Sequence, residues 1–286
     1  MQVSARSDVF VTPGELQDLM ASRHPVTVLD VRWSLAEPNG ESAYRRGHLP
    51  GAVYVSLDDE LSDHRVAGRG RHPLPSGSAV QTAARRWGLR TGVPTVVYDD
   101  WNRAGSARAW WVLTAAGLDD VRILDGGLAA WSAAGGALQS GPVTAEPGNV
   151  VVAHEDLYRG ARRTVTADQV LTGVDVLLDA RAPERFRGEV EPVDPVAGHI
   201  PGAVNLPSTD LLSGDGTLLP DADLRAALAG RGAVGGTDVA AYCGSGVTAS
   251  LAVAGLAAAG VDAALYPGSW SEWGADAAHP VARGDR

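Results

Sequence analysis

The sequence predicts an α/β protein made of two similar halves, each a small parallel sheet with helices on both faces. Three observations support this fold class: the chain contains an internal repeat, short apolar segments alternate with helical ones, and the composition is that of a soluble globular protein. Hydrophobic residues make up 45% and charged residues 20% of the 286 residues, which is enough for two cores.

The internal repeat extends through both halves of the chain. Four segments recur in the same order: residues 28–32 (Val-Leu-Asp-Val-Arg) match 177–181 (Leu-Leu-Asp-Ala-Arg), 47–53 match 198–204, 95–98 match 239–242, and 124–131 match 266–273. The same order of four matching segments in the two halves indicates a duplicated domain.

Within each half, strands and helices are expected to alternate. Buried parallel strands are predicted from short β-branched or apolar runs at residues 27–29, 95–98, 121–124, 176–178, 239–242 and 263–266. Alanine-rich segments predict helices at residues 79–87, 107–116, 224–229 and 248–259. Such alternation is typical of a parallel sheet covered by helices.

The domain boundaries follow from composition. Residues 143–163 are rich in glycine, proline and charge and match neither half, so they are predicted to link a domain of residues 1–142 to one of residues 164–286.

Charge and cysteine content exclude several classes of function. The formal net charge of −10 gives no electrostatic case for nucleic acid or an anionic membrane surface. One cysteine allows neither an internal disulfide nor a cysteine-based zinc site, so no metal is expected. Residues 1–8 contain no apolar run and no segment is long enough to span a bilayer, so we expect a cytoplasmic protein without a signal peptide.

The repeat separates structural motifs from candidate chemistry. The Asp-x-Arg and Gly-His-x-Pro-Gly-Ala-Val segments occur in both halves, so they are expected to serve the fold, with His48 and His199 bracing a turn. After the matched tyrosines the halves diverge: the first continues with Asp99, the second with Cys243-Gly-Ser-Gly-Val-Thr-Ala249. The second loop is therefore the better candidate for a functional site.

The residues of this loop are suited to bind an anion. Gly244 and Gly246 allow the backbone to curl so that successive amides, including those of Val247 and Thr248, point inward. The following helix adds partial positive charge at its N-terminus. Cys243 is then expected to be held as a reactive thiolate, and the same amides would also hold a persulfide, which is likewise an anion. The alternative is a small buried hydrophobic residue.

Three other loop chemistries fit poorly. A dinucleotide fingerprint would need an acidic residue at the end of the next strand, whereas Asp262 precedes it. A cysteine-dependent phosphatase would need arginine at Ala249, and a serine-hydrolase elbow would need glycine at Cys243.

Together these motifs resemble the two-domain rhodanese/3-mercaptopyruvate sulfurtransferases, including the closing Gly268-Ser-Trp-Ser-Glu-Trp273 segment. The resemblance extends from about Val9 to Trp273. It implies two tandem rhodanese-like domains: an inactive first domain, with Asp99 in place of the cysteine, and an active second one. It also implies a ping-pong cycle through a Cys243 persulfide, with no cofactor and with cyanide, a small thiol or a thioredoxin-like protein as acceptor.

The same resemblance implies the donor and its contacts. A loop without basic residues is similar to the 3-mercaptopyruvate type, in which Ser245 would act with His72 and with Asp59 or Asp58. The family's first substrate arginine matches Arg185.

One substrate contact departs from the family pattern. Val193 stands where the family's second substrate arginine usually lies, and Arg187 is the expected substitute. In each case with turnover the sulfur donor is expected to be a small anion. Three alternatives remain: a thiosulfate sulfurtransferase that uses the same cysteine, a non-catalytic persulfide carrier, and a silent scaffold with a buried Cys243.

Overall fold

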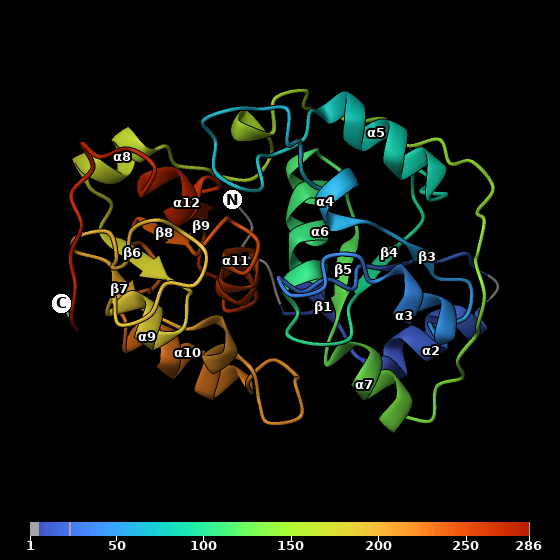
Figure 1. Cartoon of the computed structure of the whole chain (residues 1–286). Coiled ribbons are helices and arrows are strands. Elements are labelled where there is room, and N and C mark those ends of the chain that lie inside the picture. The colour runs from blue at the N-terminus through green and yellow to red at the C-terminus, as the bar shows by residue number, and fades with distance from the viewer. Residues whose placement is uncertain (1–5, 23, 286) are drawn as a thin grey trace.

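The computed structural model describes residues 6–22 and 24–285, so most of the segment 1–8 lies outside the described residues. Two parallel sheets form the framework (Figure 1). The first has the order β1 (Phe10–Val11), β5 (Val121–Leu124), β4 (Thr95–Tyr98), β2 (Thr27–Asp30) and β3 (Val53–Tyr54). The second has the order β7 (Val204–Asn205), β6 (Val176–Asp179), β8 (Val239–Tyr242) and β9 (Ala263–Leu265).

The helices lie around these sheets. In the first half they are α1 (Arg6–Val9), α2 (Pro13–Ala21), α3 (Glu41–Arg46), α4 (Leu57–Glu60), α5 (Gly77–Arg86), α6 (Ala104–Ala115) and α7 (Gly127–Ala133). The second half has α8 (Ala167–Thr172), α9 (Pro183–Phe186), α10 (Asp221–Ala229), α11 (Ala249–Ala258) and α12 (Ser269–Trp273), with 3₁₀ turns at η1 (Leu157–Arg159) and η2 (Ser208–Leu211). Among the described residues, none of the helices has the length and apolar character needed to cross a bilayer.

The α/β fold class is confirmed, and each predicted strand and helix is present with ends displaced by three residues or fewer. The strands β1, β3 and β7 were not predicted. Each has only two residues and pairs at the edge of a sheet, which is too short for a periodic pattern.

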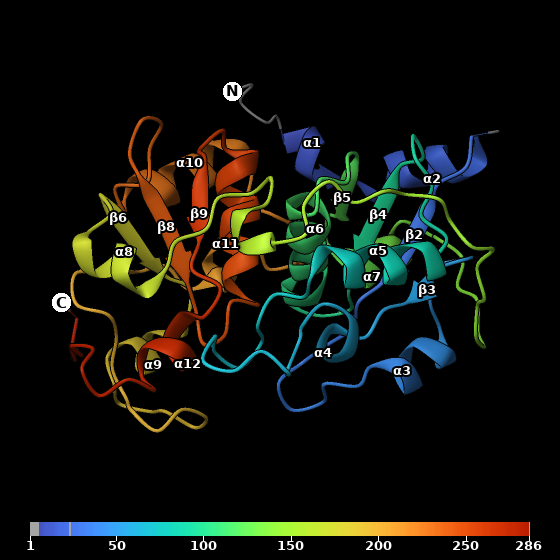
Figure 2. The same ribbon diagram turned by 90° about the horizontal axis from the view of Figure 1, so that it is seen from above.

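Helices α6 and α11 join the two halves (Figures 1 and 2). Every residue of α11 is buried, and in α6 only Thr114 is partly exposed. A helix that is apolar on all sides is stable only when it is covered on all sides. One hydrophobic cluster therefore extends through both halves, from Leu29 in β2 to Leu178 in β6.

The duplicated Asp-x-Arg motif is structural in both halves. The Asp30–Arg32 pair is buried, with Arg32 Nη2 2.8 Å from Asp30 Oδ2 and 2.6 Å from the carbonyl oxygen of Gly47. Arg181 makes the same contacts with Asp179 and the carbonyl oxygen of Gly198. Each arginine thus fastens a strand end to the following turn.

The histidines of the repeated turn are also buried. The ring of His48 stacks on Tyr44 and the ring of His199 on Phe186, with both histidines fully inaccessible to solvent. This agrees with their expected role in bracing the turn.

Gly105 illustrates how closely α6 approaches the sheet. A Cβ atom built on Gly105 would lie 2.0 Å from the carbonyl oxygen of Val31. We expect Gly105→Ala to lower the free energy of unfolding by about 1–3 kcal/mol through overpacking, although alanine favours helices. Chemical denaturation would measure this change in the free energy of unfolding.

The matched control is Gly14→Ala. Gly14 is the second residue of α2, as Gly105 is of α6, and no atom lies within 4 Å of its Cβ position. This variant should be neutral or more stable by up to about 1 kcal/mol. Equal effects of the two substitutions would contradict the close approach.

Candidate functional site

Cys243 is the first residue after β8 and begins the loop that leads into α11. Its backbone N–H donates to Ser269 Oγ at 3.1 Å, and its carbonyl oxygen accepts from the Trp270 N–H at 3.0 Å. Ser269 adopts a left-handed conformation with φ of 53°, which is unusual for a residue other than glycine. The cysteine, only 1% exposed, is thus fixed between β8 and the start of α12.

The loop after Cys243 presents unpaired backbone amides. In the described part of the chain, no group accepts a hydrogen bond from the N–H groups of residues 244–248. Gly246 has φ of 77°, and a Cβ atom there would lie 2.4 Å from the carbonyl oxygen of Pro267. Only glycine fits this conformation and this approach, so the loop is shaped to bind an anion through its amides.

The first half shows how such a loop is satisfied internally. Asp99, which occupies the position of Cys243, accepts hydrogen bonds from the backbone N–H groups of Trp101, Arg103 and Ser106 at 3.0–3.2 Å. The side chain of Arg103 also pairs with Asp99 at 3.1 Å. The first loop therefore contains its own anion and its own cation, whereas the second loop has a thiol at that position.

Two of the predicted catalytic residues meet across the domain boundary. The hydroxyl of Ser245 lies 2.7 Å from Nδ1 of His72, which comes from the first half of the chain. Nε2 of His72 lies 3.3 Å from Oδ1 of Asp58, and the indole N–H of Trp33 donates to the same carboxylate at 3.1 Å. Ser245, His72 and Asp58 thus form a continuous chain.

Asp59, the acid named first in the prediction, does not contact His72 in the structure. Its carboxylate accepts a hydrogen bond from the hydroxyl of Ser56. Its backbone N–H donates to the oxygen of that hydroxyl, so Ser56 caps the N-terminus of α4. Asp58, the neighbour that the sequence left as the second option, faces His72 instead. Adjacent residues of a helix point about 100° apart, so only one of the two can reach the imidazole.

The electrostatics of the chain favour a neutral imidazole. Burial lowers the pKa of His72 from its ordinary value of 6.5, although the contact with Asp58 opposes this shift. The hydrogen bond with His72 lowers the pKa of Asp58. Because a carboxylate can only accept, Nε2 carries the proton of the neutral ring, and Nδ1 accepts the hydroxyl proton of Ser245.

The segment that carries His72 is held against the second half by close backbone packing. Gly70, with φ of 79°, lies so near α12 that a Cβ atom would be 2.4 Å from the carbonyl oxygen of Gly268. The backbone N–H of Arg71 donates to Ser271 Oγ at 2.9 Å. These contacts fix residues 61–72 over the Cys243 loop.

Arg108 was not predicted from the sequence, although a single charged residue within the largely apolar residues 104–113 is a detectable signal. Its fully buried guanidinium donates to the carbonyl oxygens of Leu61, His72 and Gly246 at 3.0–3.4 Å. Burial lowers the pKa of Arg108 to about 10, which leaves it charged at neutral pH. One cation of α6 therefore ties the His72 segment to the Cys243 loop.

Arg185, from α9, lies next to the loop as expected. A Cβ atom on Gly244 would be 3.5 Å from Nη1 of Arg185, and Nη2 pairs with Glu191 at 2.6 Å. Arg187 does not support the expectation that it replaces the missing arginine: its guanidinium pairs with Glu189 at 2.8 Å, and its carbonyl oxygen accepts from Gly284 N–H.

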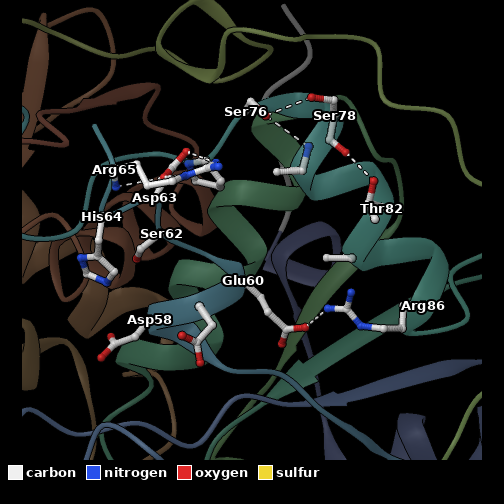
Figure 3. A pocket seen from close by; sticks show the side chains of 14 residues that line it. Asp58, Glu60, Ser62, Asp63, His64, Arg65, Ser76, Ser78, Thr82 and Arg86 are labelled. Atoms are coloured by element: carbon white, nitrogen blue, oxygen red, sulfur yellow. Dashed lines mark hydrogen bonds and ion pairs between the residues drawn. The ribbon is translucent and has the colours of Figure 1, made fainter. Parts of the chain in front are cut away.

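Asp58 also opens to solvent. Its side chain is 32% exposed and lines a cavity of about 600 Å³ that is bordered by α4 and α5. In Figure 3 Asp58 lies at one side of this cavity, with the ion pairs Arg65–Asp63 and Arg86–Glu60 farther along its wall. The acid end of the chain can therefore exchange protons with water.

The fold and the sequence of the chain are those of a known family. The rhodanese-like domain matches residues 12–134 and 165–276, and the chain belongs to the rhodanese-like family. It is a two-domain sulfurtransferase of the thiosulfate or 3-mercaptopyruvate type.

Similar proteins carry both donor names. A Mycobacterium tuberculosis protein named "Putative thiosulfate sulfurtransferase SseB" is 60% identical over 99% of each chain. A Pseudomonas aeruginosa protein named "Probable 3-mercaptopyruvate sulfurtransferase" is 45% identical over 92% of this chain and 94% of its own. The crystal structure of the 3-mercaptopyruvate enzyme SseA from Escherichia coli has a TM-score of 0.79 at 32% identity, over 92% of this chain and 98% of that one.

The close packing at Gly70 leads to a prediction. We expect Gly70→Ala to displace the segment 61–72 from Gly268, so that trypsin cleaves after Arg65, Arg69 or Arg71 more rapidly than in the unaltered protein. Gly68→Ala is the control, because Gly68 also has a positive φ, 72°, but its Cβ position is open. Equal cleavage of the two variants would show that backbone strain, and not the contact with Gly268, holds the segment.

Proposed function

We propose that this sulfurtransferase moves sulfur from 3-mercaptopyruvate to a thiol or cyanide acceptor through a persulfide on Cys243. The observation that supports this donor most directly is the 2.7 Å contact between His72 Nδ1 and the hydroxyl of Ser245, two residues after the cysteine. A thiol-containing keto acid gives up and regains a proton during the reaction, and thiosulfate does not. A proton relay is therefore useful only with the former.

Sulfur transfer begins with attack of the Cys243 thiolate on the sulfur of the donor. The new S–S bond forms as the C–S bond of the donor breaks, and the electron pair of that bond passes to the carbon, giving the enolate of pyruvate. The unpaired amides of residues 244–248 stabilise the anionic sulfur before and after transfer. Preorganised amides need no rearrangement at that moment, which makes this stabilisation effective.

The proton follows the chain of three residues. Ser245 takes the proton of the donor thiol while its own proton passes to His72, and the resulting imidazolium is stabilised by Asp58. Reversal of the relay protonates the enolate carbon, so pyruvate is released without net uptake of a proton. The persulfide then transfers its outer sulfur to cyanide, a small thiol or a thioredoxin-like protein.

The donor carboxylate is expected to pair with Arg185. The guanidinium of Arg185 lies beside Gly244, next to the nucleophile, and its side chain is 18% exposed. A planar guanidinium binds a carboxylate through two parallel hydrogen bonds. This contact orients the donor so that its sulfur meets Cys243.

Thiosulfate is the second candidate donor. The mycobacterial relative at 60% identity is named for it, and the arginines beside Gly244 could also bind its charge. The same cysteine and the same amides would serve, while the relay through Ser245 would be idle.

The two donors can be compared directly. We expect kcat/KM for 3-mercaptopyruvate to exceed that for thiosulfate by at least about tenfold with cyanide as common acceptor, because only the former uses the relay. A preference for thiosulfate would overturn the proposed donor while leaving the persulfide chemistry intact.

Cys243→Ser serves as the blank in this comparison. It should fold normally by circular dichroism and show no turnover with either donor. Labelling of the unaltered protein with one sulfur atom, detected by mass spectrometry but without multiple turnovers, would indicate a persulfide carrier. Failure of Cys243 to react with donor or thiol reagent would indicate a silent scaffold.

The pairing of Asp58 with His72 predicts a specific pH dependence. His72 must be neutral to accept a proton, so activity with 3-mercaptopyruvate should fall as the pH drops below the lowered pKa of His72. Asp58 raises that pKa, so Asp58→Asn should move this acid limb to lower pH. It should also reduce kcat by about 10²-fold, because the imidazolium loses its stabilising charge.

The neighbouring carboxylate provides the control for this prediction. Asp59→Asn should leave both the rate and the pH profile unchanged, since asparagine can keep the hydrogen bonds with Ser56. Equal losses in the two variants would contradict the assignment of Asp58.

A further inference from the structure

Arg71, from the first half of the chain, lies beside Arg185 next to the Cys243 loop. We propose that Arg71 is the second donor-binding cation, and that Asp194, held between Arg71 and Arg185, makes the site prefer a singly charged donor over a doubly charged one. This inference rests on the proposed function and adds to it two residues that determine donor specificity.

The two guanidinium groups converge on the residue that follows the nucleophile. A Cβ atom on Gly244 would lie 3.3 Å from Arg71 Nη2 and 3.5 Å from Arg185 Nη1. Arg71 comes from the first half of the chain and Arg185 from the second. A side chain at position 244 would fill the space beside both groups, so glycine keeps them accessible to a ligand bound at Cys243.

Arg71 is oriented but still has free donors. Its backbone is fixed by the hydrogen bond from its N–H to Ser271, and its Nη1 lies 2.7 Å from Asp194 Oδ1. Its Nε is buried and, among the described residues, has no hydrogen-bond partner. A guanidinium carries five N–H donors, so the contact with Asp194 leaves most of them for a ligand.

Asp194 connects the two arginines. Its Oδ1 pairs with Arg71 and its Oδ2 lies 3.4 Å from Arg185 Nη2, with only 5% of the side chain exposed. Its backbone N–H donates to Glu191, the other carboxylate that pairs with Arg185. Val193, where an arginine would stand, is 38% exposed and adds no charge.

The charges of this cluster are balanced. Arg71 and Arg185 carry two positive charges, and Glu191 and Asp194 carry two negative ones, so their formal sum is zero. Glu191 also lies 3.4 Å from Arg181, whose charge is already offset by a buried carboxylate of its own, so the balance is unchanged. A single carboxylate can join the free N–H groups at modest electrostatic cost. A doubly charged donor such as thiosulfate brings two negative charges close to Asp194, and like charges at this distance repel.

Steady-state kinetics with both donors test the role of Arg71. We expect Arg71→Gln to raise KM for 3-mercaptopyruvate by about tenfold or more, as for loss of a charge-assisted hydrogen bond, with a smaller change in kcat. Arg65→Gln is the control, because Arg65 lies in the same segment but is exposed and pairs with Asp63. It should leave both constants unchanged.

A second substitution separates donor binding from a loss of local structure. Val193→Arg, added to the Arg71→Gln variant, restores a cation at the family's usual position. It should bring KM for 3-mercaptopyruvate most of the way back to that of the unaltered enzyme. Failure of this rescue together with faster trypsin cleavage after Arg65 or Arg69, the sites that remain in this segment, would show that Arg71 serves only to hold the segment, and would overturn the proposal.

The role of Asp194 has its own readout. Asp194→Asn keeps the size of the side chain but removes its charge, so the ratio of kcat/KM for thiosulfate to that for 3-mercaptopyruvate should rise by about tenfold. An unchanged ratio, or one that moves toward 3-mercaptopyruvate, would overturn the assigned role of Asp194.

These outcomes can be distinguished from failure of the proposed function. If the unaltered enzyme prefers thiosulfate, the donor proposal fails, yet a raised KM in Arg71→Gln alone would still support Arg71 as an anion-binding residue. If Arg71→Gln matches Arg65→Gln with both donors while Cys243→Ser is inactive, the Arg71 proposal fails and the persulfide mechanism stands.

Discussion

The packing of α6 on α11 is the constraint on which the remainder of the molecule depends. Both helices are apolar on nearly every side, so neither half can expose its helix to water without a large loss of buried surface. Their contact brings Arg108 within hydrogen-bonding distance of both the Cys243 loop, at Gly246, and the segment 61–72, at His72. The same segment packs on Gly268 through Gly70. The Cys243 loop in one domain and His72 in the other are thereby brought into direct contact.

The fold was largely predictable from the sequence, because duplication provides an internal check on each strand and helix. Cys243, Ser245 and the loop glycines were identifiable because they occur in only one half, and the structure brings His72 to Ser245 as the resemblance implied. The choice between Asp58 and Asp59 could not be made, since it depends on the direction in which one turn of α4 faces. Arg71, Arg108 and Ser269 were missed because their roles arise from contacts between distant segments, which no local pattern reveals.

The loops that follow β4 and β8 occupy equivalent places in the two halves but are satisfied differently. In the first, Asp99 satisfies the amides and Arg103 fills the space around it, so the loop is complete without a ligand. In the second, a thiol stands at the same position and the amides have no partner within the described residues. The aligned residues 99–104 and 243–248 differ at every position, and the result is one loop that satisfies its own amides and one that, among the described residues, does not.

The position of His72 has a consequence for how such a chain can evolve. The half without a cysteine is not a passive remnant of duplication, because it carries His72 and Asp58 as well as the buried cation Arg108 that spans the boundary. Under the proposed mechanism neither copy is sufficient, because one has the nucleophile and the other has the groups that face it. Deletion of either copy would then remove an entire side of the proposed site, so a chain of this kind could not return to a single domain and keep that mechanism.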